Sequence, residues 1–414
     1  MPEIITFRNF HYKDGKENSE RLAKLTAPPY DVISKEEELD LKNMDTDNIC
    51  HVILPKSYKD AGKKLDEMIN NKTLICGDDR CFCIYGITFK KPDSDETITR
   101  YGFVGLLKLV EIFPASDGVI PHESTFQKYT KDRLNLIKQT DANFSPIFTI
   151  YDGNGSAESV LKKYTNNKPI LQSTDKDGFI HKIWEIWKEE DVNAIKEIIE
   201  KNSIIIADGH HRYVTSLRHS RNGGCKYIMS LFIDFNDPGL IIYTSHRQVE
   251  QLSINNINDL LAKLDQYFKI TRTENLEETK ALMEHNKDKH AFGCYFQDNY
   301  IYFKLRENLD PAKLINGSHS NEWKRLDIPI LHNIVFKELL KLDDEVISFM
   351  KDVNKGIKNV KDNKIDALFL VNPTTLSQIQ EVTNLGEIMP QKSTYFFPKP
   401  LSGLIIHKHT NEIE

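Results

Sequence analysis

The sequence lacks long apolar runs, a paired set of cysteines and a recognisable export signal. No segment approaches the roughly 18–20 consecutive apolar residues that a membrane-spanning helix needs. The first residues, MPEIITFRNFHYKDG, do not show the charged-then-apolar order of a signal peptide. The six cysteines indicate no disulfide framework, which is typical of reduced thiols in a cytosol. We therefore expect a cytoplasmic protein without a membrane partner.

Basic residues are not in excess either. The chain carries 55 Lys and Arg against 61 Asp and Glu, which gives a formal net charge of −6. Proteins that hold nucleic acid by bulk electrostatics usually present a basic face, so this balance argues against a nucleic-acid partner. It leaves room for a small phosphorylated or amino-acid ligand in a local basic pocket. The sequence does not indicate an oligomeric state.

The length of 414 residues exceeds the size at which a single core stops growing, so two or three domains are expected. Apolar alternation predicts strands, and apolar positions at helical spacing predict helices between them. The predicted strands include 81–89, 100–112, 145–152, 178–188, 203–207, 226–235 and 239–249, and the predicted helices include 58–71, 131–139, 189–202 and 257–268. This mixture predicts an α/β or α+β fold with mixed sheets. We place the divisions at 1–165, 166–255 and 256–414.

The most informative stretch is SIIIADGHHRYVTSLRHSR, residues 203–221, in which an apolar strand passes through a short polar turn into a helix. The start of a helix has unpaired backbone N–H groups and a positive dipole end, which together bind anions such as phosphate. Gly209 permits a tight bend, and the His-His-Arg run at 210–212 adds donors suited to phosphoryl oxygens. Asp208 is placed to hold a divalent cation or to accept a proton.

An alternative interpretation is that Asp208 only caps the helix, with Gly209 in the turn and the histidines in solvent. A lone Asp-Gly pair favours this cap. The full run Asp-Gly-His-His-Arg after an apolar strand favours a ligand site. A cation, a phosphate clamp and a carboxylate base are the parts that phosphoryl transfer needs, so the stretch predicts that chemistry.

The segment ADGHHRY resembles the Asp-Gly-His-His-Arg box of the ParB/sulfiredoxin-like superfamily, whose shared property is phosphate handling at this box. From end to end the chain resembles the family catalogued as domain of unknown function 1015. This resemblance is carried, in order, by APPYDVIS, PHESTFQKYTKDRLNLIKQTDANFSPIFTIYD, IADGHHRY, PGLIIYTSHR and MPQKSTYFFPKPLSGLII. It implies a ParB/sulfiredoxin-like core at 166–255 with additional N- and C-terminal α/β parts.

One branch of that family is associated with pyrophosphate-dependent serine kinase activity. The resemblance therefore implies a kinase that converts free L-serine and pyrophosphate into O-phospho-L-serine and phosphate. It also implies a magnesium complex of the donor at the helix start, with Asp208 as the metal ligand. Glu123, Asp31 or Asp208 would take the serine proton, and the sequence does not choose among them.

Polar segments elsewhere in the chain extend the predicted site. The predicted catalytic residues are Asp208, His210, His211, Glu123 and Asp31. The predicted phosphate-binding residues are Gly209, Arg212, Lys128, Arg133, Lys392, Ser393 and Thr394. The predicted substrate-binding residues are His122, Ser124, Thr125, Asn143, Ser145, His246 and Arg247. Each segment also has a plainer interpretation, as a solvated loop, a turn cap or a strand rim.

Three other functions remain open at this point. The first is an ATP- or ADP-dependent kinase of serine or another small hydroxylated metabolite, although the absence of a GxxxxGK[ST] loop gives pyrophosphate weak support. The second is a ParB-like, nucleotide-responsive DNA-associated protein, against which the acidic charge and the missing helix-turn-helix pattern argue. The third is a phosphatase that hydrolyses phosphoserine.

Overall fold

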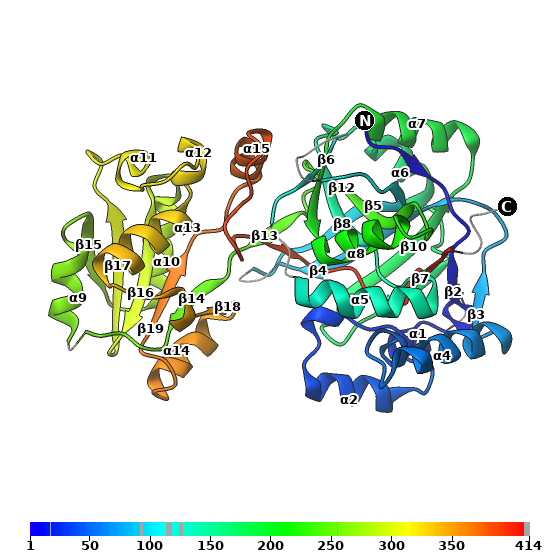
Figure 1. Cartoon of the computed structure of the whole chain (residues 1–414), viewed down its shortest axis with the longest axis horizontal. Coiled ribbons are helices and arrows are strands. Elements are labelled where there is room, and N and C mark those ends of the chain that lie inside the picture. Colours follow the sequence, from blue (N-terminus) through cyan, green and yellow to red (C-terminus); the bar gives the residue numbers. More distant parts are fainter. Residues whose placement is uncertain (17, 92–93, 113–117, 124–126, 255, 410–414) are drawn as a thin grey trace. The chain divides into compact units, whose positions relative to one another are not determined.

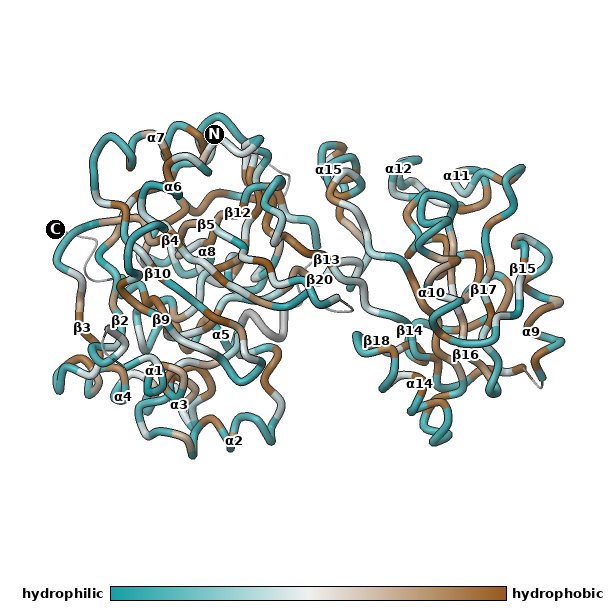
Figure 2. Tube along the Cα trace, turned by 180° about the vertical axis from the view of Figure 1, so that it is seen from behind, coloured by the Kyte–Doolittle hydropathy of each residue, from teal (hydrophilic) through white to brown (hydrophobic). Residues whose placement is uncertain are grey.

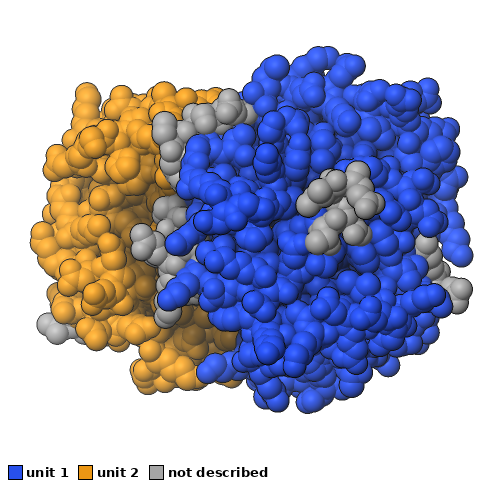
Figure 3. All heavy atoms as spheres, turned by 45° about the vertical axis from the view of Figure 1, so that its right-hand side comes forward, with its two compact units in different colours: residues 1–241, 398–414 blue, residues 242–397 orange. Residues whose placement is uncertain are grey.

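The structure is a computed structural model of the chain, and it describes residues 1–16, 18–91, 94–112, 118–123, 127–254 and 256–409. The chain forms two compact units (Figure 3). Unit 1 comprises Met1–Ile241 and Pro398–Glu414, and unit 2 comprises Ile242–Phe397. The two ends of the chain therefore belong to the same unit (Figure 1).

Unit 1 is built on a nine-stranded mixed sheet, counted over the described residues. Neighbouring strands run antiparallel except in the pairs β6–β11 and β8–β12, which are parallel. In spatial order the strands are β6 (Val119–Pro121), β11 (Ile204–Asp208), β8 (Ile147–Tyr151), β12 (Tyr227–Asp234), β5 (Thr97–Lys108), β4 (Phe82–Lys90), β10 (Ile180–Ile186) and β9 (Leu171–Thr174), with β1 (Ile4–Ile5) paired to β5.

Helices bury their apolar stripes against this sheet. Val160, Ile195 and Tyr213, from three different helices, share one core cluster with the strand residues Phe103 and Ile204. By contrast α2 is largely hydrophilic along its length, and Leu41 is its buried residue (Figure 2). The helices of unit 1 are α1 (Ser19–Leu25), α2 (Lys35–Met44), α3 (Cys50–Ile53), α4 (Tyr58–Asn70), α5 (Gln127–Thr140), α6 (Glu158–Thr165), α7 (Glu189–Glu200) and α8 (His210–Ser220).

Two short antiparallel pairs complete unit 1. The strand β2 (Phe10–Tyr12) pairs with β3 (Leu74–Cys76). The strand β7 (Ala142–Asn143) pairs with β21 (His407–Lys408), so the last described segment of the chain returns to residues that follow α5. This return brings the C-terminal segment into the unit that carries β11 and α8.

Unit 2 holds an antiparallel sheet whose strands lie in the order β15 (Phe268–Thr273), β17 (Asn299–Leu305), β16 (Ala291–Phe296), β19 (Ala367–Val371), β14 (His246–Val249) and β18 (Ile347–Met350). Alternate residues of these strands enter two separate core clusters, so the sheet is covered on both faces. A π-helix at Ile330–Leu339 and α9 (Ile257–Leu264) contribute to one cluster. The other cluster receives α10 (Leu276–His285) and α14 (Val353–Lys361).

The other strands and α-helices of unit 2 lie outside this sheet. They are β13 (Ile241–Tyr243), which begins at the last residue before unit 2, β20 (Tyr395–Phe397), α11 (Pro311–Leu314), α12 (Asn321–Lys324), α13 (Asp327–Pro329) and α15 (Leu376–Asn384). No helix among the described residues is both long enough and apolar enough to cross a bilayer.

The predicted fold class, a mixed α/β structure with several sheets, is confirmed. The predicted hairpin of strands 81–89 and 100–112 is the pair β4–β5. One predicted strand, 239–249, is divided into β13 and β14, because Thr244 and Ser245 interrupt the extended chain between them.

The two units differ from the three predicted parts of the chain. The strands β8 and β12 come from the first and second predicted parts, yet they are neighbours in one sheet. The predicted division at 165/166 therefore falls inside unit 1, and that at 255/256 falls inside unit 2. Pairing between strands that are distant in the sequence leaves no trace in local periodicity, which is why the pattern did not indicate it. The ParB/sulfiredoxin-like character of the core stays a prediction.

Candidate functional site

The turn between β11 and α8 depends on a glycine. Gly209 is the N-cap residue of α8 with φ 95°, in the left-handed region that favours glycine. A Cβ atom at this position would lie 2.8 Å from Ile147 Cγ2. Gly209 rather than Asp208 is the N-cap residue, and no side-chain cap is made within the described part of the chain, so the interpretation of Asp208 as a helix cap is wrong. The first N–H groups of an α-helix have no partner within the helix, which is the property that an anion-binding helix start needs.

Asp208 lies instead between two basic side chains. Its Oδ2 accepts a hydrogen bond from Arg212 Nη2 at 2.8 Å, and its Oδ1 pairs with Lys399 Nζ. Lys399 Nζ also lies 3.4 Å from Asp31 Oδ2. The Lys399 side chain is 9% exposed and that of Asp208 is 18% exposed, whereas that of Asp31 is 43% exposed. One ammonium group thus joins a buried carboxylate to an accessible one.

Asp208 and Lys399 keep each other ionised. Burial alone would raise the pKa of Asp208, but the charges of Lys399 and Arg212 outweigh it and hold that pKa well below its usual range. Burial likewise acts to lower the pKa of Lys399, and Asp208 and Asp31 outweigh it and raise that pKa. At neutral pH Asp208 is therefore a carboxylate, and its weak basicity makes it a poor proton acceptor.

Arg212 is held by protein groups on its other side as well. Its Nη1 donates to Pro146 O at 2.7 Å, to Ser145 Oγ at 3.2 Å and to Ser145 O at 3.4 Å. These bonds fix the start of α8 against the segment before β8. Arg212 therefore positions Asp208, and its role in binding phosphate stays a prediction.

Two buried histidines lie beside the turn. His210 Nε2 accepts from the backbone N–H groups of His122 and Glu123 at 3.3 and 3.4 Å, so its Nδ1 carries the proton. His122 Nδ1 donates to Ile206 O at 2.5 Å, and the two imidazole rings stand 4.8 Å apart. Burial lowers the pKa of both histidines, which keeps both rings neutral. His211, the next residue of α8, is partly exposed.

Lys399 is a residue that the sequence reasoning missed. The carbonyl of Pro398 accepts from the buried Arg100 at 2.6 Å, and the N–H of Leu401 donates to Tyr85 Oη at 3.0 Å. The backbone is therefore held both before and after Lys399, and this positions the ammonium group. The feature of the sequence that could have indicated Lys399 is its position between Pro398 and Pro400, because prolines restrict the backbone. It follows closely on the Lys-Ser-Thr triplet, which was among the predicted residues.

Asp31 belongs to the rigid turn that the two preceding prolines predicted. It lies in a 3₁₀ turn, Tyr30–Val32, and the bridge between Ala27 and Ser402 links this turn to the segment that carries Lys399. Arg133 stacks over the Tyr30 ring at 4.1 Å. It also donates to Ile53 O at 2.9 Å and to Asp132, so in this structure its guanidinium contacts protein groups.

A small cavity of about 60 Å³ opens next to this group of residues. Its lining includes Tyr30, Arg133, Asn143, Ser145 and Arg212. Asn143 also accepts from Met229 N at 3.2 Å, which ties the cavity wall to β12.

The structure brings together only part of the predicted site. Within unit 1, the residues around the turn and the cavity are Asp31, His122, Glu123, Arg133, Asn143, Ser145, Asp208, Gly209, His210, His211 and Arg212. Ser124 and Thr125 lie outside the described residues. Lys128 is in the first turn of α5, and its side chain is outside the described part. The other predicted residues belong to unit 2.

In unit 2, Arg247 and His246 are internal. Arg247 is fully buried, contacts Ser245 O and donates to His332 Nε2 at 3.2 Å. Burial lowers the pKa of Arg247 to about 9 and that of His246 to about 4. His246 Nδ1 accepts from the backbone N–H of Val371 at 3.2 Å. Both side chains have structural partners, so their role in binding substrate stays a prediction.

The Lys-Ser-Thr triplet forms a turn before β20. Lys392 has φ 55°, and Ser393 is buried with its Oγ donating to Pro390 O at 2.5 Å. Ser393 O accepts from Thr374 Oγ1 at 3.2 Å. A residue of positive φ within a turn is typical of anion-binding backbone nests, and phosphate binding by Lys392, Ser393 and Thr394 stays a prediction.

A family profile described as "Protein of unknown function (DUF1015)" matches residues 4–329, so the chain belongs to the DUF1015 family. Among characterised proteins, it is similar to an ATP-dependent L-serine kinase of Staphylothermus marinus, with 22% identity over 195 residues. That alignment covers 46% of this chain and 65% of the relative, so the chain spans less than two thirds of the relative's length.

Two solved structures are distantly similar. One is a conserved hypothetical protein from Pyrococcus furiosus, with 15% identity, a TM-score of 0.33, and coverage of 69% of this chain and 90% of that one. The other is a free serine kinase in complex with AMP, with 13% identity, a TM-score of 0.35, and coverage of 69% and 88%. At these TM-scores neither similarity carries an inference about this chain.

Proposed function

We propose that this member of the DUF1015 family is a kinase that transfers a phosphoryl group to the hydroxyl of free L-serine and forms O-phospho-L-serine. The observation that carries the proposal is the array Asp208–Lys399–Asp31 at the start of α8. The described activity of the archaeal relative supports the choice of reaction.

The array has the composition that phosphoryl transfer needs. Such a reaction has a loose transition state, so positioning and neutralisation of charge contribute most of the rate. The N-terminus of α8 offers backbone N–H groups and a positive dipole end to the phosphate. Lys399 adds a buried ammonium whose raised pKa keeps it charged throughout the neutral range.

Asp31 is the carboxylate that we assign as the general base. Both oxygens of Asp208 are committed to Lys399 and Arg212, and its depressed pKa makes it a weak acceptor. The side chain of Asp31 is accessible, and its ion-pair contact with Lys399 is the longer one, at 3.4 Å. A serine hydroxyl next to Asp31 would give up its proton there while its oxygen attacks phosphorus.

The cavity beside Arg212 is our candidate for the serine site. It is lined by Asn143 and Ser145, both predicted substrate-binding residues. Tyr30, which also lines the cavity, precedes Asp31 in the same 3₁₀ turn. A serine bound here would be adjacent to the proposed base.

Mg²⁺ is the proposed metal. Asp208 is its predicted ligand: each of its oxygens makes one contact, with Lys399 or Arg212, so each has a second lone pair for a metal ion, and Mg²⁺ prefers oxygen ligands of this kind. Asp208 would hold the ion together with oxygens of the donor, which leaves Asp31 to take the serine proton. When bound, Mg²⁺ would neutralise charge on the phosphate groups that are transferred and released.

Two donors are compatible with the site. Pyrophosphate is implied by the branch of the family noted above, and it needs neither a base pocket nor ribose contacts. ATP is favoured by the description of the archaeal relative. An experiment must therefore decide between pyrophosphate and ATP as the phosphate donor.

The test measures phosphoserine and phosphate formed by the purified protein with L-serine and Mg²⁺. Pyrophosphate, ATP, ADP and no donor are compared in parallel. Phosphoserine formed with one donor and absent without it supports the kinase and identifies the donor. Release of phosphate from phosphoserine without a donor would identify a phosphatase instead. The absence of phosphoserine with all donors would overturn the proposal.

A further inference from the structure

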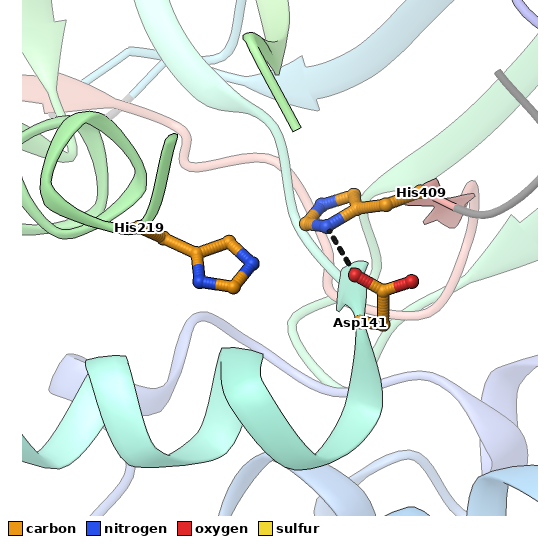
Figure 4. A group of neighbouring side chains, drawn as sticks. All are labelled: Asp141, His219 and His409. Carbon is orange, nitrogen blue, oxygen red and sulfur yellow. Dashed lines mark hydrogen bonds and ion pairs between the residues drawn. The ribbon is translucent and has the colours of Figure 1, made fainter. Parts of the chain in front are cut away.

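Asp141, His219 and His409 form a cluster at the opposite end of α8 from Asp208. Each offers one ligand atom, and these atoms all lie within 4.8 Å of one another. His409 Nδ1 is 3.1 Å from Asp141 Oδ1, and the His219 ring points toward this pair (Figure 4). Among the described residues, no other group of three such side chains meets these conditions.

The histidines of the cluster have nitrogens that nothing in the described part of the chain satisfies. Both ring nitrogens of His219 and the Nε2 of His409 are buried and have no hydrogen-bond partner there. His409 is 4% exposed. Buried polar atoms are nearly always bonded, and a site that binds an ion is one of the standard reasons for an exception.

The local field favours a cation. Asp141 directly follows the last residue of α5, and His219 lies in the last turn of α8. The C-terminal end of a helix carries a partial negative charge, so two such ends add to the charge of the Asp141 carboxylate. The nearby cations are Lys408, whose Nζ is 3.8 Å from Asp141 Oδ2 and also donates to Thr140 O, and Lys138.

The position of the His219 ring depends on a glycine. Gly224 follows α8, and a Cβ atom there would lie 2.3 Å from His219 Nε2 and 2.2 Å from its Cδ2. The ring therefore packs directly against the backbone of the turn. This packing leaves the imidazole directed toward Asp141 and His409 rather than toward solvent (Figure 4).

We propose that Asp141, His219 and His409 bind a divalent transition metal, Zn²⁺ foremost, with two imidazole nitrogens and one carboxylate oxygen. Zinc sites with three protein ligands of this kind leave one position to water. In tetrahedral Zn²⁺ sites with bonds of about 2.0–2.1 Å, ligand atoms lie about 3.4 Å apart, so the widest separation in the cluster would close by up to about 1.4 Å. Iron(II) is the second ion that two histidines and a carboxylate suit.

This site is separate from the proposed kinase site. His210 and His219 are nine residues apart on α8, which corresponds to about 14 Å along the helix axis. Mg²⁺ prefers oxygen ligands, so the two sites would select different ions. The metal would tie β21 to α5 and α8, and so anchor the C-terminal segment that also carries Lys399.

The test is equilibrium dialysis of the full chain, stripped of metal, against Zn²⁺ in the presence of excess Mg²⁺. We expect about one Zn²⁺ per chain and a rise in melting temperature on binding. Binding should weaken about 100-fold in Asp141→Asn and in His219→Ala. Asn tolerates the left-handed conformation of residue 141, where φ is 47°, so the first variant keeps the fold.

His290→Gln is the matched control, because His290 also bonds an aspartate through Nδ1, to Asp327 at 2.9 Å, but without a third ligand. It should bind Zn²⁺ like the natural chain. Co²⁺ substitution provides a second measurement, since its visible absorption should report imidazole ligation that Asp141→Asn perturbs. No uptake of Zn²⁺ by the natural chain would overturn the proposal. Equal binding by Asp141→Asn, His219→Ala and the control would do so too.

Discussion

Asp208 and Asp31 share the Lys399 ammonium but differ in every property that sets their chemistry. Asp208 is largely buried, with both oxygens bonded to basic groups. Asp31 is accessible and makes its contact at 3.4 Å. The first residue therefore contributes mainly to structure and to the placing of Lys399, and the second can be reached by a substrate hydroxyl. We therefore expect substitution of Asp31 to lower mainly the activity and substitution of Asp208 to lower mainly the stability.

We predict that Asp31→Asn lowers kcat for phosphoserine formation by about 10²–10³-fold, because the amide cannot accept the serine proton. The free energy of unfolding should change by less than about 1 kcal/mol, since Asp31 is 43% exposed and Lys399 keeps Asp208 as its partner. Donor-saturated turnover and urea unfolding measure the two effects. Glu36→Gln, an exposed acid of α2, is the control for charge alone. Unchanged turnover of Asp31→Asn would exclude Asp31 as the base.

For Asp208→Asn we predict a loss of about 3 kcal/mol in unfolding free energy at pH 7, because Lys399 and Arg212 keep buried charges without their partner. The pKa of Asp208 is depressed in the folded state, so its contribution is fully present above its unfolded pKa of about 3.9 and decreases as the pH falls below that value.

The stability difference between the natural chain and Asp208→Asn should therefore be largest near neutral pH and shrink below about pH 4. Urea unfolding at a series of pH values measures it. A difference that grew as the pH fell would contradict the assigned sign.

The turn between β11 and α8 and the segment 398–401 are the two elements that assemble the site. Gly209 lets the strand pass into the helix so closely that α8 presents its first N–H groups beside Asp208. Arg100 and Tyr85 hold the segment with Lys399 by its backbone. Both elements depend on backbone conformation and backbone hydrogen bonds, which the types of the residues alone do not reveal.

Gly209→Ala tests the turn. Alanine would have to adopt the left-handed φ of 95°, and its Cβ would lie 2.8 Å from Ile147 Cγ2. We therefore predict a loss of at least about 2 kcal/mol in unfolding free energy. Gly155→Ala is the matched control, because Gly155 has φ 74° but nothing within 4 Å of its Cβ position. The excess loss in Gly209→Ala over the control, in urea unfolding, measures the crowding at the turn. Equal losses of unfolding free energy in the two variants would show that the contact with Ile147 does not destabilise the chain.

The whole chain consists of one continuous unit inserted into a discontinuous one. Unit 2 runs from Ile242 to Phe397 without interruption and has its own core, whereas unit 1 needs Pro398–Glu414 to complete it. That final segment supplies Lys399 to the proposed kinase site and His409 to the proposed metal site.

We predict that residues 242–397 expressed alone fold cooperatively, because their sheet is covered on both faces by their own helices. Circular dichroism and a urea transition would show this. A chain ending at Phe397 should lack kinase activity, since it lacks Lys399. A non-cooperative transition of the isolated unit 2 would contradict the prediction.

Much of the local structure was predictable from the residues. Strands such as 81–89 and helices such as 58–71 follow from periods of two and 3.6 residues, and they appear within a few residues of the predicted limits. The run 208–212 was also recognisable, because its parts are contiguous and each residue type limits the backbone or the charge. Sheet order was not predictable, since it depends on pairing between distant strands.

The sequence by itself determined the class of fold, the elements and the glycine turn that leads from a strand into α8, because these depend on interactions within a few residues. Only the tertiary structure decided that Lys399 joins Asp208 to Asp31, and that His409 meets Asp141 and His219. Lys399 and Asp208 are 191 residues apart. Their contact arises because burial of Leu404, Ile405 and Ile406 folds the last segment back into unit 1, and no local pattern records where that return ends.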